Sequence, residues 1–336
     1  MDLLGDMVKA GLIGIGSMGR NHARVLAEIG ALAGVADADA GALKDIEKRF
    51  GVPTHTDYRT LLASDIEAVV VATPTETHMQ IALDAIAEGK HVLVEKPIAK
   101  TLDDSSKIIK AAERAGVVLA VGMIERHNPV VRFAKGALTD KRFGSLVSLS
   151  SKRVSSFPAR IRDVGVVLDL GIHDLDVMRY LNGSEPKSVF ALGGTMGGSK
   201  FEDHANILVD FDSGAKGYCE INWLTPMKVR RLSLTCTSNF VELDYMNQVA
   251  HISSSQFVDI DMGNLYQAPL EFDIRTVNLK KQEPLKNELT DFLGAITKGT
   301  EPLVTGKDAL ESMRLALAAL ESLRSKKKVD LSSFGG

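Results

Sequence analysis

An acid and a histidine at helical spacing are the residues best placed to do chemistry. Asp169 and His173 are four residues apart in a stretch that predicts a helix over 166–181. Residues at i and i+4 share one face of a helix, so the carboxylate can orient the imidazole and make it a better base. The pair suits general base catalysis, and a surface ion pair is the alternative. A metal site that adds Asp176 is conceivable, but nothing else suggests it, and we predict no metal.

A glycine-rich turn near the N-terminus predicts a dinucleotide site. It follows a predicted strand over 8–15 and opens a predicted helix over 18–29. In that setting the first glycine permits a tight turn, the second lets the backbone approach a pyrophosphate, and the third lets helix and strand pack closely. The predicted cofactor-binding residues of this turn are Gly14, Gly16, Ser17, Met18 and Gly19.

An acid at the end of the second predicted strand indicates which dinucleotide binds. Asp37 follows Gly19 by eighteen residues and is itself followed by Ala38. A carboxylate there accepts hydrogen bonds from the adenosine ribose hydroxyls and repels a 2′-phosphate. Arg, Lys or Ser would be expected after it in an NADP site. The sequence therefore predicts NAD.

A lysine follows a later strand of the same predicted sheet. Glu95-Lys96-Pro97 comes directly after the apolar run 91–94, at the carboxyl edge of the sheet, where ligands bind in open α/β folds. A cationic nicotinamide and a partly desolvated pocket would both disfavour the charged form of Lys96. Pro97 fixes the following backbone and so helps to aim the lysine. We predict that Lys96 exchanges protons with a bound substrate.

Three arginines precede the Asp169/His173 helix. Arg153, Arg160 and Arg162 lie in the segment 152–163, at and after a predicted strand over 145–154. Guanidinium groups suit bidentate recognition of phosphate or carboxylate, which a neutral cyclitol would not require. We predict that these arginines bind an anionic substrate group. A solvated loop with scattered charge is the alternative.

The elements that carry the glycine turn, Asp37 and Lys96 alternate strictly between strand and helix. Apolar, β-branched runs are each followed by a helical stretch from residue 8 to about residue 121, which predicts an α/β Rossmann domain with a doubly wound parallel sheet. The predicted strands are 8–15, 31–36, 68–72, 91–94 and 117–121, and the predicted helices are 18–29, 40–50, 75–88 and 102–115.

The rhythm changes after residue 122. Helices over 128–138 and 166–181 are followed by successive strands without helices between them, and then by two helices over 285–297 and 307–325. This order predicts an α+β domain with a large, open and mainly antiparallel sheet. We assign 1–122 to the Rossmann domain and 123–336 to a substrate-binding and oligomerisation domain, with 1–6 as a disordered extension.

Composition excludes several classes of partner. The 336 residues carry a formal net charge of -3 and no basic block, so no nucleic-acid partner is expected. No apolar run is long enough to cross a bilayer, and residues 1–6 lack the basic start of a secretory signal. Cys219 and Cys236 have neither metal-type nor redox-type spacing. We therefore expect a cytoplasmic protein without a membrane partner.

Taken together, these motifs resemble the Gfo/Idh/MocA oxidoreductase family. The resemblance rests on the glycine turn, Asp37, the run Val69-Val70-Val71-Ala72-Thr73-Pro74 and above all Glu95-Lys96-Pro97, and it covers essentially the whole chain. It implies that Thr73, Pro74 and His78 line the cofactor site and that Glu95 and Lys96 border the nicotinamide. It further implies homodimers or homotetramers that form through the open sheet.

The resemblance also implies an activity, the oxidation of a ring secondary hydroxyl of a sugar by NAD. In the family, the Asp-x-x-x-His pattern, here Asp169 and His173, is used together with the lysine, here Lys96. The arginine segment and the helix resemble the nucleotide-sugar branch, the UDP-N-acetylglucosamine 3-dehydrogenases, which implies that the 3-hydroxyl of a UDP-N-acetylhexosamine is oxidised. Arg126 and Asn128 of the segment 125–129 would face the sugar, although an aromatic residue is more usual where His127 stands.

Three alternatives stay open at this point. The first is an inositol or aldose dehydrogenase of the same family, which differs only in its substrate. The second is a hydrolase or isomerase that keeps NAD bound and uses transient oxidation. The third, from another class, is a non-catalytic NAD-binding sensor, which would carry out no hydride transfer.

Overall fold

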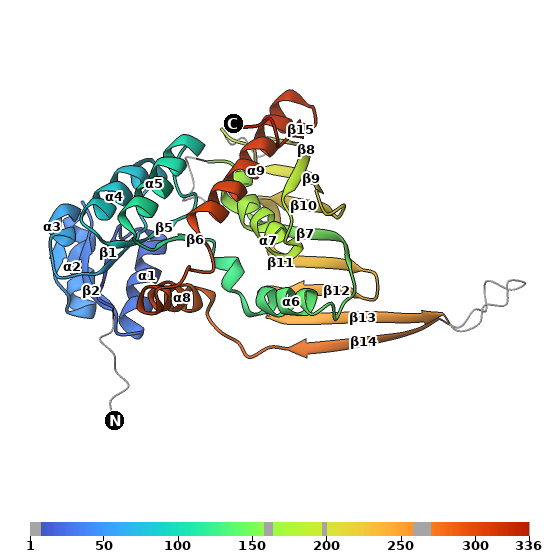
Figure 1. Ribbon diagram of the computed structural model, residues 1–336, viewed down its shortest axis with the longest axis horizontal. Coiled ribbons are helices and arrows are strands. Elements are labelled where there is room, and N and C mark those ends of the chain that lie inside the picture. Colours follow the sequence, from blue (N-terminus) through green and yellow to red (C-terminus); the bar gives the residue numbers. More distant parts are fainter. Residues whose placement is uncertain (1–7, 158–163, 197–199, 258–269, 336) are drawn as a thin grey trace, which may run out of the picture. The chain divides into compact units, whose positions relative to one another are not determined.

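The computed structural model describes residues 8–157, 164–196, 200–257 and 270–335. The chain forms two compact units (Figure 1), one of residues 1–127 with 283–313 and one of 128–282 with 314–336. The predicted extension over 1–6 lies outside the described residues. Among the described helices, none is both long and apolar enough to cross a membrane.

The first unit is built on a parallel sheet of six strands in the order β3-β2-β1-β4-β5-β6. The strands are β1 (Ala10–Ile13), β2 (Leu32–Ala36), β3 (Thr54–His55), β4 (Ala68–Val71), β5 (His91–Glu95) and β6 (Leu119–Gly122). The helices are α1 (Ser17–Glu28), α2 (Ala40–Phe50), α3 (Tyr58–Leu62), α4 (Thr75–Ala87), α5 (Leu102–Ala115), the 3-10 turn η1 (Ile124–His127), α8 (Pro284–Lys298) and the first part of α9 (Gly306–Ser325).

The local sequence explains these elements. Every residue of β1 and β4 is buried, as a parallel sheet covered on both faces requires. Asp39 caps α2 by accepting from two backbone N–H groups, and Gly51 ends that helix in the left-handed region with φ 67°. The strand order reverses between β1 and β4, and this switch point is where ligands bind in open α/β sheets.

A late helix completes the first unit, which corrects the predicted boundary between 122 and 123. Leu285, Leu289 and Phe292 of α8 are buried in the same apolar cluster as residues of β1 and α1. Figure 1 shows α8 beside α1, although more than 250 residues separate them in the sequence. Segment 283–313 therefore belongs to the Rossmann unit because its apolar face covers that core.

The second unit is built on a nine-stranded sheet in the order β14-β13-β12-β11-β7-β10-β9-β8-β15. The strands β7 and β10 run parallel, and the other neighbours are antiparallel. The strands are β7 (Leu146–Ser156), β8 (Pro186–Gly194), β9 (His204–Phe211), β10 (Lys216–Asn222), β11 (Leu224–Cys236), β12 (Phe240–Asp244), β13 (Val249–Phe257), β14 (Leu270–Asn278) and β15 (Val329–Asp330).

The helices of this unit cover one face of the sheet, and described residues of the other face, such as Leu208 and Tyr218, are exposed. The helices α6 (Pro129–Thr139) and α7 (Ile172–Asn182) pack on it, together with a π-helical turn η2 (Val167–Gly171) and the last part of α9. Alternate residues of β9 and β10 point to the two faces, which produces alternating burial. The predicted fold class is confirmed in both units.

Candidate active site

The glycine turn has the geometry that a dinucleotide site needs. Gly14 has φ +97°, and a Cβ on Gly19 would come within 1.9 Å of the Gly14 carbonyl oxygen. A Cβ on Gly16 would meet nothing within 4 Å, so there is open space at the N-terminus of α1. The first turn of α1 contains no acidic residue to compete with an anion. Ser17 is exposed and Met18 half-buried beside this space. The turn therefore fits a pyrophosphate.

The two glycines of this turn should respond differently to a methyl group. Gly16→Ala is expected to melt at the wild-type temperature without ligand but to bind NAD about tenfold more weakly or worse, because its Cβ enters the pyrophosphate space. Gly19→Ala is expected to lower the melting temperature as well, since its Cβ meets backbone. Thermal denaturation and calorimetric titration with NAD measure both effects. Wild-type affinity in Gly16→Ala would contradict the assignment of this turn.

Asp37 ties the end of β2 to the glycine turn. One carboxylate oxygen accepts from the N–H of Ile15 at 2.5 Å, and the other accepts from the N–H of Asp39 at 2.8 Å. Each carboxylate oxygen has a second lone pair, so ribose hydroxyls can still donate to it. The geometry is compatible with the predicted ribose contact.

His78 holds two loops together, and its place in the cofactor site stays a prediction. The residue is 1% exposed, and its two ring nitrogens lie 2.9 Å from the carbonyl oxygens of Pro97 and Thr73. Burial lowers the pKa of the imidazole, although the two carbonyl oxygens favour its protonation. His78 thereby links the Thr73-Pro74 segment to the Glu-Lys-Pro turn. Thr73 is half-buried, and its Oγ1 accepts a hydrogen bond from Thr77 Oγ1 at 2.8 Å.

The Glu-Lys-Pro turn follows β5 at the carboxyl edge of the sheet. Glu95 Oε1 lies 2.7 Å from His22 Nε2, and Glu95 Oε2 accepts from the backbone N–H of Lys96 at 3.2 Å. Burial raises the pKa of Glu95, but the hydrogen bond with His22 and the charges of His22 and Lys96 outweigh it, so that the pKa lies below its ordinary value. The Lys96 side chain is half-buried. The carboxylate of Glu95 thus fixes the backbone that carries the lysine.

The second unit places Asp169 and His173 across a change of helix type. Asp169 lies in the π-helical turn η2, and His173 lies in the first turn of α7. Asp169 is 9% exposed and His173 half-buried. Asp176, one turn further on, is 1% exposed. Single π-helical turns are uncommon and are enriched at functional sites. The sequence predicted one continuous α-helix here.

A glutamate from outside the helix caps the start of this π-helical turn. The backbone oxygen of Glu202 accepts from the N–H of Val166 at 2.9 Å, and its Oε1 accepts from the N–H of Val167 at 3.2 Å. Burial raises the pKa of Glu202 above its ordinary value, although the hydrogen bonds from its own N–H and from that of Val167 oppose the rise. On the sheet side, a Cβ on Gly171 would come within 2.8 Å of Ile221, so glycine lets the turn lie close to β10. The sequence analysis did not single out Glu202 or Gly171.

Arg153 is an internal residue, and its predicted contact with a substrate stays a prediction. Its Nε and Nη2 donate to the two carboxylate oxygens of Asp174 at 2.7 and 3.2 Å. The two side chains are 2% and 1% exposed. The guanidinium also lies 5.4 Å from the centre of the Tyr245 ring. Arg153 is therefore committed to joining β7 to α7. Arg160 and Arg162 lie outside the described residues.

Asn128 likewise has internal partners. Its side-chain oxygen accepts from the N–H of Val130 at 3.2 Å, and its amide nitrogen donates to the carbonyl oxygen of Tyr245 at 3.1 Å. Asn128 is the N-cap of α6, with Pro129 as the first helical residue. Asparagine followed by proline is a strong helix-start signal. A contact between Asn128 and the sugar stays a prediction.

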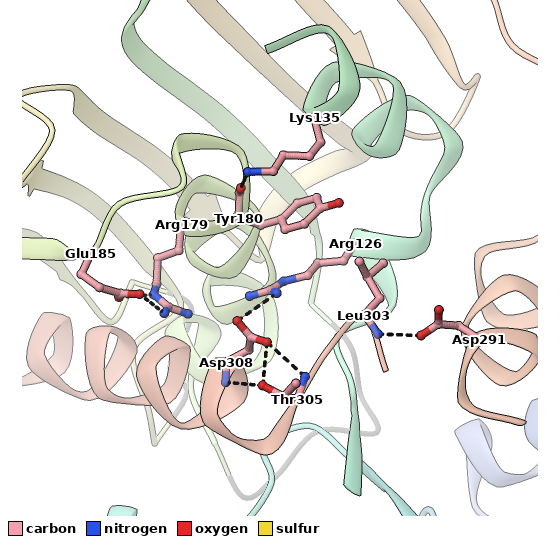
Figure 2. A network of polar contacts seen from close by, with 9 residues as sticks. All are labelled: Arg126, Lys135, Arg179, Tyr180, Glu185, Asp291, Leu303, Thr305 and Asp308. Carbon is pink, nitrogen blue, oxygen red and sulfur yellow. Dashed lines mark hydrogen bonds and ion pairs between the residues drawn. The ribbon is translucent and has the colours of Figure 1, made fainter. Parts of the chain in front are cut away.

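Arg126 pairs with an acid of α9 in the first unit. Figure 2 shows its guanidinium directed at Asp308, with Nη1 and Oδ1 3.2 Å apart. Thr305 donates to the same carboxylate from its hydroxyl at 2.7 Å and from its backbone N–H at 3.1 Å. Burial raises the pKa of Asp308, but the charge of Arg126 and these hydrogen bonds bring it below the ordinary value. A contact between Arg126 and a substrate stays a prediction.

Comparison with known proteins assigns the family. A model described as the Gfo/Idh/MocA oxidoreductase family with an NAD-binding Rossmann fold matches residues 8–123, and the Gfo/Idh/MocA C-terminal domain matches residues 131–242. The chain is 30% identical to UDP-N-acetylglucosamine 3-dehydrogenase of Acidithiobacillus ferrooxidans over 314 residues, which cover 94% of this chain and 96% of that protein.

Two further similarities agree with this result. A solved structure of the Acidithiobacillus ferrooxidans enzyme has a TM-score of 0.85 at 28% identity and covers 94% of this chain and 97% of the other. Inositol 2-dehydrogenase of Rhizobium meliloti is 28% identical over 343 residues, which cover 96% of this chain and 99% of that enzyme. With the glycine turn, Asp37 and the Glu-Lys-Pro turn in place, the chain belongs to the Gfo/Idh/MocA family and is an NAD-dependent dehydrogenase that acts on CH–OH groups.

Proposed function

We propose that the protein oxidises a ring secondary hydroxyl of a sugar, with His173 as the base and Lys96 as its partner. His173 takes the hydroxyl proton, Asp169 orients and polarises His173, and Lys96 hydrogen-bonds the reacting oxygen and relays protons. Bound NAD supplies the hydride acceptor. The roles of His173 and Lys96 are interchangeable in this scheme. The observation that carries the proposal is the placement of Asp169 and His173 across a π-helical turn.

The substrate we propose is a UDP-N-acetylhexosamine, oxidised at its 3-hydroxyl. The similarity to UDP-N-acetylglucosamine 3-dehydrogenase along nearly the whole chain supports it. Because Arg153 pairs with Asp174, Arg160 and Arg162 are the arginines that we propose to bind an anionic substrate group. An inositol is the second candidate, because inositol 2-dehydrogenase is almost as similar. A free aldose, an NAD-retaining hydrolase or isomerase, and a non-catalytic NAD sensor remain the other candidates.

A substrate panel tests this proposal. We expect NADH absorbance to appear with UDP-N-acetylglucosamine or a related UDP-sugar and NAD, and to be absent with inositols and free aldoses. NAD is expected to be strongly preferred to NADP, because Asp37 would repel a 2′-phosphate. Turnover of an inositol alone would show that the substrate is an inositol and not a UDP-sugar, while the NAD-dependent oxidation would stand. Product formation without release of NADH would favour the hydrolase or isomerase, and no hydride transfer at all would favour the sensor.

We also propose that the open sheet face is an oligomer interface. Leu208 faces Tyr218 across β9 and β10, and both are exposed, as is Leu192 on β8. On the other half of the sheet, Phe240 and Ile274 belong to the same row and are 41% and 55% exposed. Apolar patches of this kind usually mark association sites. A homodimer or homotetramer would bury them, and sedimentation analysis would measure its size.

A further inference from the structure

A buried glutamate outside the proposed catalytic set lies directly behind the Glu-Lys-Pro turn. Glu288, on α8, is 2% exposed. Among the described residues, neither of its carboxyl oxygens has a hydrogen-bond partner. An ionised carboxylate that is buried and accepts from no described donor would be strongly destabilising. A buried unpartnered acid of this kind needs a physical explanation.

Two titratable side chains lie beside it, both in the same unit. Donor or acceptor atoms of His22, Glu95 and Glu288 all lie within 4.8 Å of one another. His22 is fully buried and in contact with Glu95, whose second oxygen accepts from the Lys96 N–H. Gly122 borders the same carboxylate, and a Cβ there would come within 2.9 Å of Glu95 Oε2. Glu95 is therefore tightly confined between α1, β6 and its own turn.

Two carboxylates at this separation inside a protein do not both ionise easily. Glu95 has the compensating partners, because it accepts from Lys96 N–H and contacts His22. Glu288 has none of these, and burial, followed by the negative charges of Glu95 and Asp291, raises its pKa well above the ordinary value. Glu95 is thus the ionised member of the pair and Glu288 the neutral one.

The other charged groups near Glu288 do not favour its ionised form. The elements that pack on α8 or adjoin the cluster carry Arg20, Arg24 and Glu28 on α1, Lys96 after β5, and Glu125, Arg126 and His127 on η1. Arg24 pairs with Glu28 and Glu283 at the surface, and Arg126 pairs with Asp308. Asp291, on α8 itself, accepts from the N–H of Leu303 at 2.7 Å.

We propose that Glu288 is a buried neutral carboxylic acid that positions Glu95 and, through Glu95, the turn that carries Lys96. This inference rests on the proposed role of Lys96. While Glu288 keeps its proton, Glu95 is free to accept from the Lys96 N–H and to contact His22. When Glu288 loses its proton, repulsion acts on a carboxylate that Gly122 and the turn confine. The turn then loosens. Glu288 is therefore a positioning residue, and activity falls at the alkaline pH at which it ionises.

The pH dependence of stability tests the protonation state without any substrate. The folded protein keeps the Glu288 proton, whereas the unfolded chain releases it above about pH 4.3. Wild-type stability therefore falls as pH rises from there toward the folded pKa, and Glu288→Gln, which mimics the neutral acid, lacks this loss. We expect the melting temperature of Glu288→Gln minus that of wild type to be positive and to widen between about pH 4.3 and pH 8. Glu301→Gln, an exposed control, should show a flat difference.

Activity of the NAD-loaded enzyme tests the positioning role. Glu288→Gln should retain most of kcat near neutral pH and lose the alkaline decline of the wild type. Glu288→Leu should lower kcat by about tenfold or more at every pH with little change in KM for NAD, because the turn is displaced by a fraction of an ångström. Equal alkaline limbs in wild type and Glu288→Gln would contradict the positioning role, even if the stability difference has the expected sign.

The principal rival is a divalent cation held by His22, Glu95 and Glu288. His22 Nε2 and Glu95 Oε1 are 2.7 Å apart, a hydrogen-bond distance, which favours a shared proton over a cation between them. Metal analysis of the purified protein should find less than one equivalent, and a chelator should leave the melting temperature unchanged. A stoichiometric metal that Glu288→Gln loses, or a pH-independent difference in melting temperature, would overturn the neutral acid. Both readouts are independent of the sugar substrate and so of the proposed function.

Discussion

Replacing Lys96 by methionine is expected to lower kcat by about a hundredfold to ten-thousandfold while NAD binds with nearly wild-type affinity. Methionine keeps the length and apolar stem of lysine but has no proton to donate. The backbone of the turn should persist, because Glu95 accepts from the main-chain N–H of Lys96 and Nδ1 of His78 lies 2.9 Å from the carbonyl oxygen of Pro97. His173→Ala should cause a similar loss, since the proposed base is then absent. Steady-state kinetics and calorimetric NAD titration measure the two quantities.

The chain offers a matched control for this prediction. Lys100 lies in the same loop, but its side chain is 68% exposed and contacts Glu76 at the surface. Lys100→Met should leave kcat and NAD affinity as in the wild type. Unchanged turnover in Lys96→Met or His173→Ala would remove that residue from the catalytic set. A large loss of NAD affinity in Lys96→Met would assign the lysine to cofactor binding instead.

Replacing Asp174 by alanine is expected to lower the free energy of unfolding by about 3–5 kcal/mol, which is the second large effect. The substitution leaves the guanidinium of Arg153 buried without its bidentate partner. A buried pair is costly to break because the remaining charge loses its bidentate counter-charge while it stays buried. Denaturant unfolding, followed by the fluorescence of the buried Trp223, measures the change.

A double substitution separates the cost of leaving Arg153 without Asp174 from the net contribution of the ion pair to stability. Arg153→Met with Asp174→Leu removes both charges and fills similar volume, so it should recover much of the stability that Asp174→Ala loses. Asp210→Asn is the surface control, because Asp210 pairs with Lys216 at exposed positions, and its effect should be far smaller. Wild-type stability of Asp174→Ala would show that Arg153 finds another partner.

The Rossmann unit could largely be predicted from the sequence because its signals are local. Apolar runs such as Ala68–Val71 specify buried strands without reference to the rest of the chain. The short β3 and α3 were missed, since Thr54–His55 has too few residues for a periodic pattern. The hairpin strands β13 and β14 were missed as well, because serines interrupt the alternation in Val249–Phe257.

The site was harder to predict because its partners are distant in the sequence. The pairing of Arg153 with Asp174 and the bond from Asn128 to Tyr245 depend on the fold, so composition favoured substrate roles for both. The π-helical turn at Asp169 has the same apolar pattern as an α-helix, so the sequence does not distinguish the two. Glu288 was missed for a similar reason, since a single acid in an amphipathic helix normally faces water.

The late arrival of α8 has a consequence for synthesis of the chain. The Rossmann core that residues 8–127 begin is covered by Leu285, Leu289 and Phe292, which the ribosome makes only after strands β7 to β14 of the second sheet. A nascent chain of about 127 residues therefore exposes apolar surface that it cannot yet cover, and it lacks the acid behind the Glu-Lys-Pro turn. Folding of the nucleotide-binding half must wait for, or be revised by, the last part of the chain. An N-terminal fragment cut at the apparent domain boundary would retain the glycine turn and be prone to aggregate.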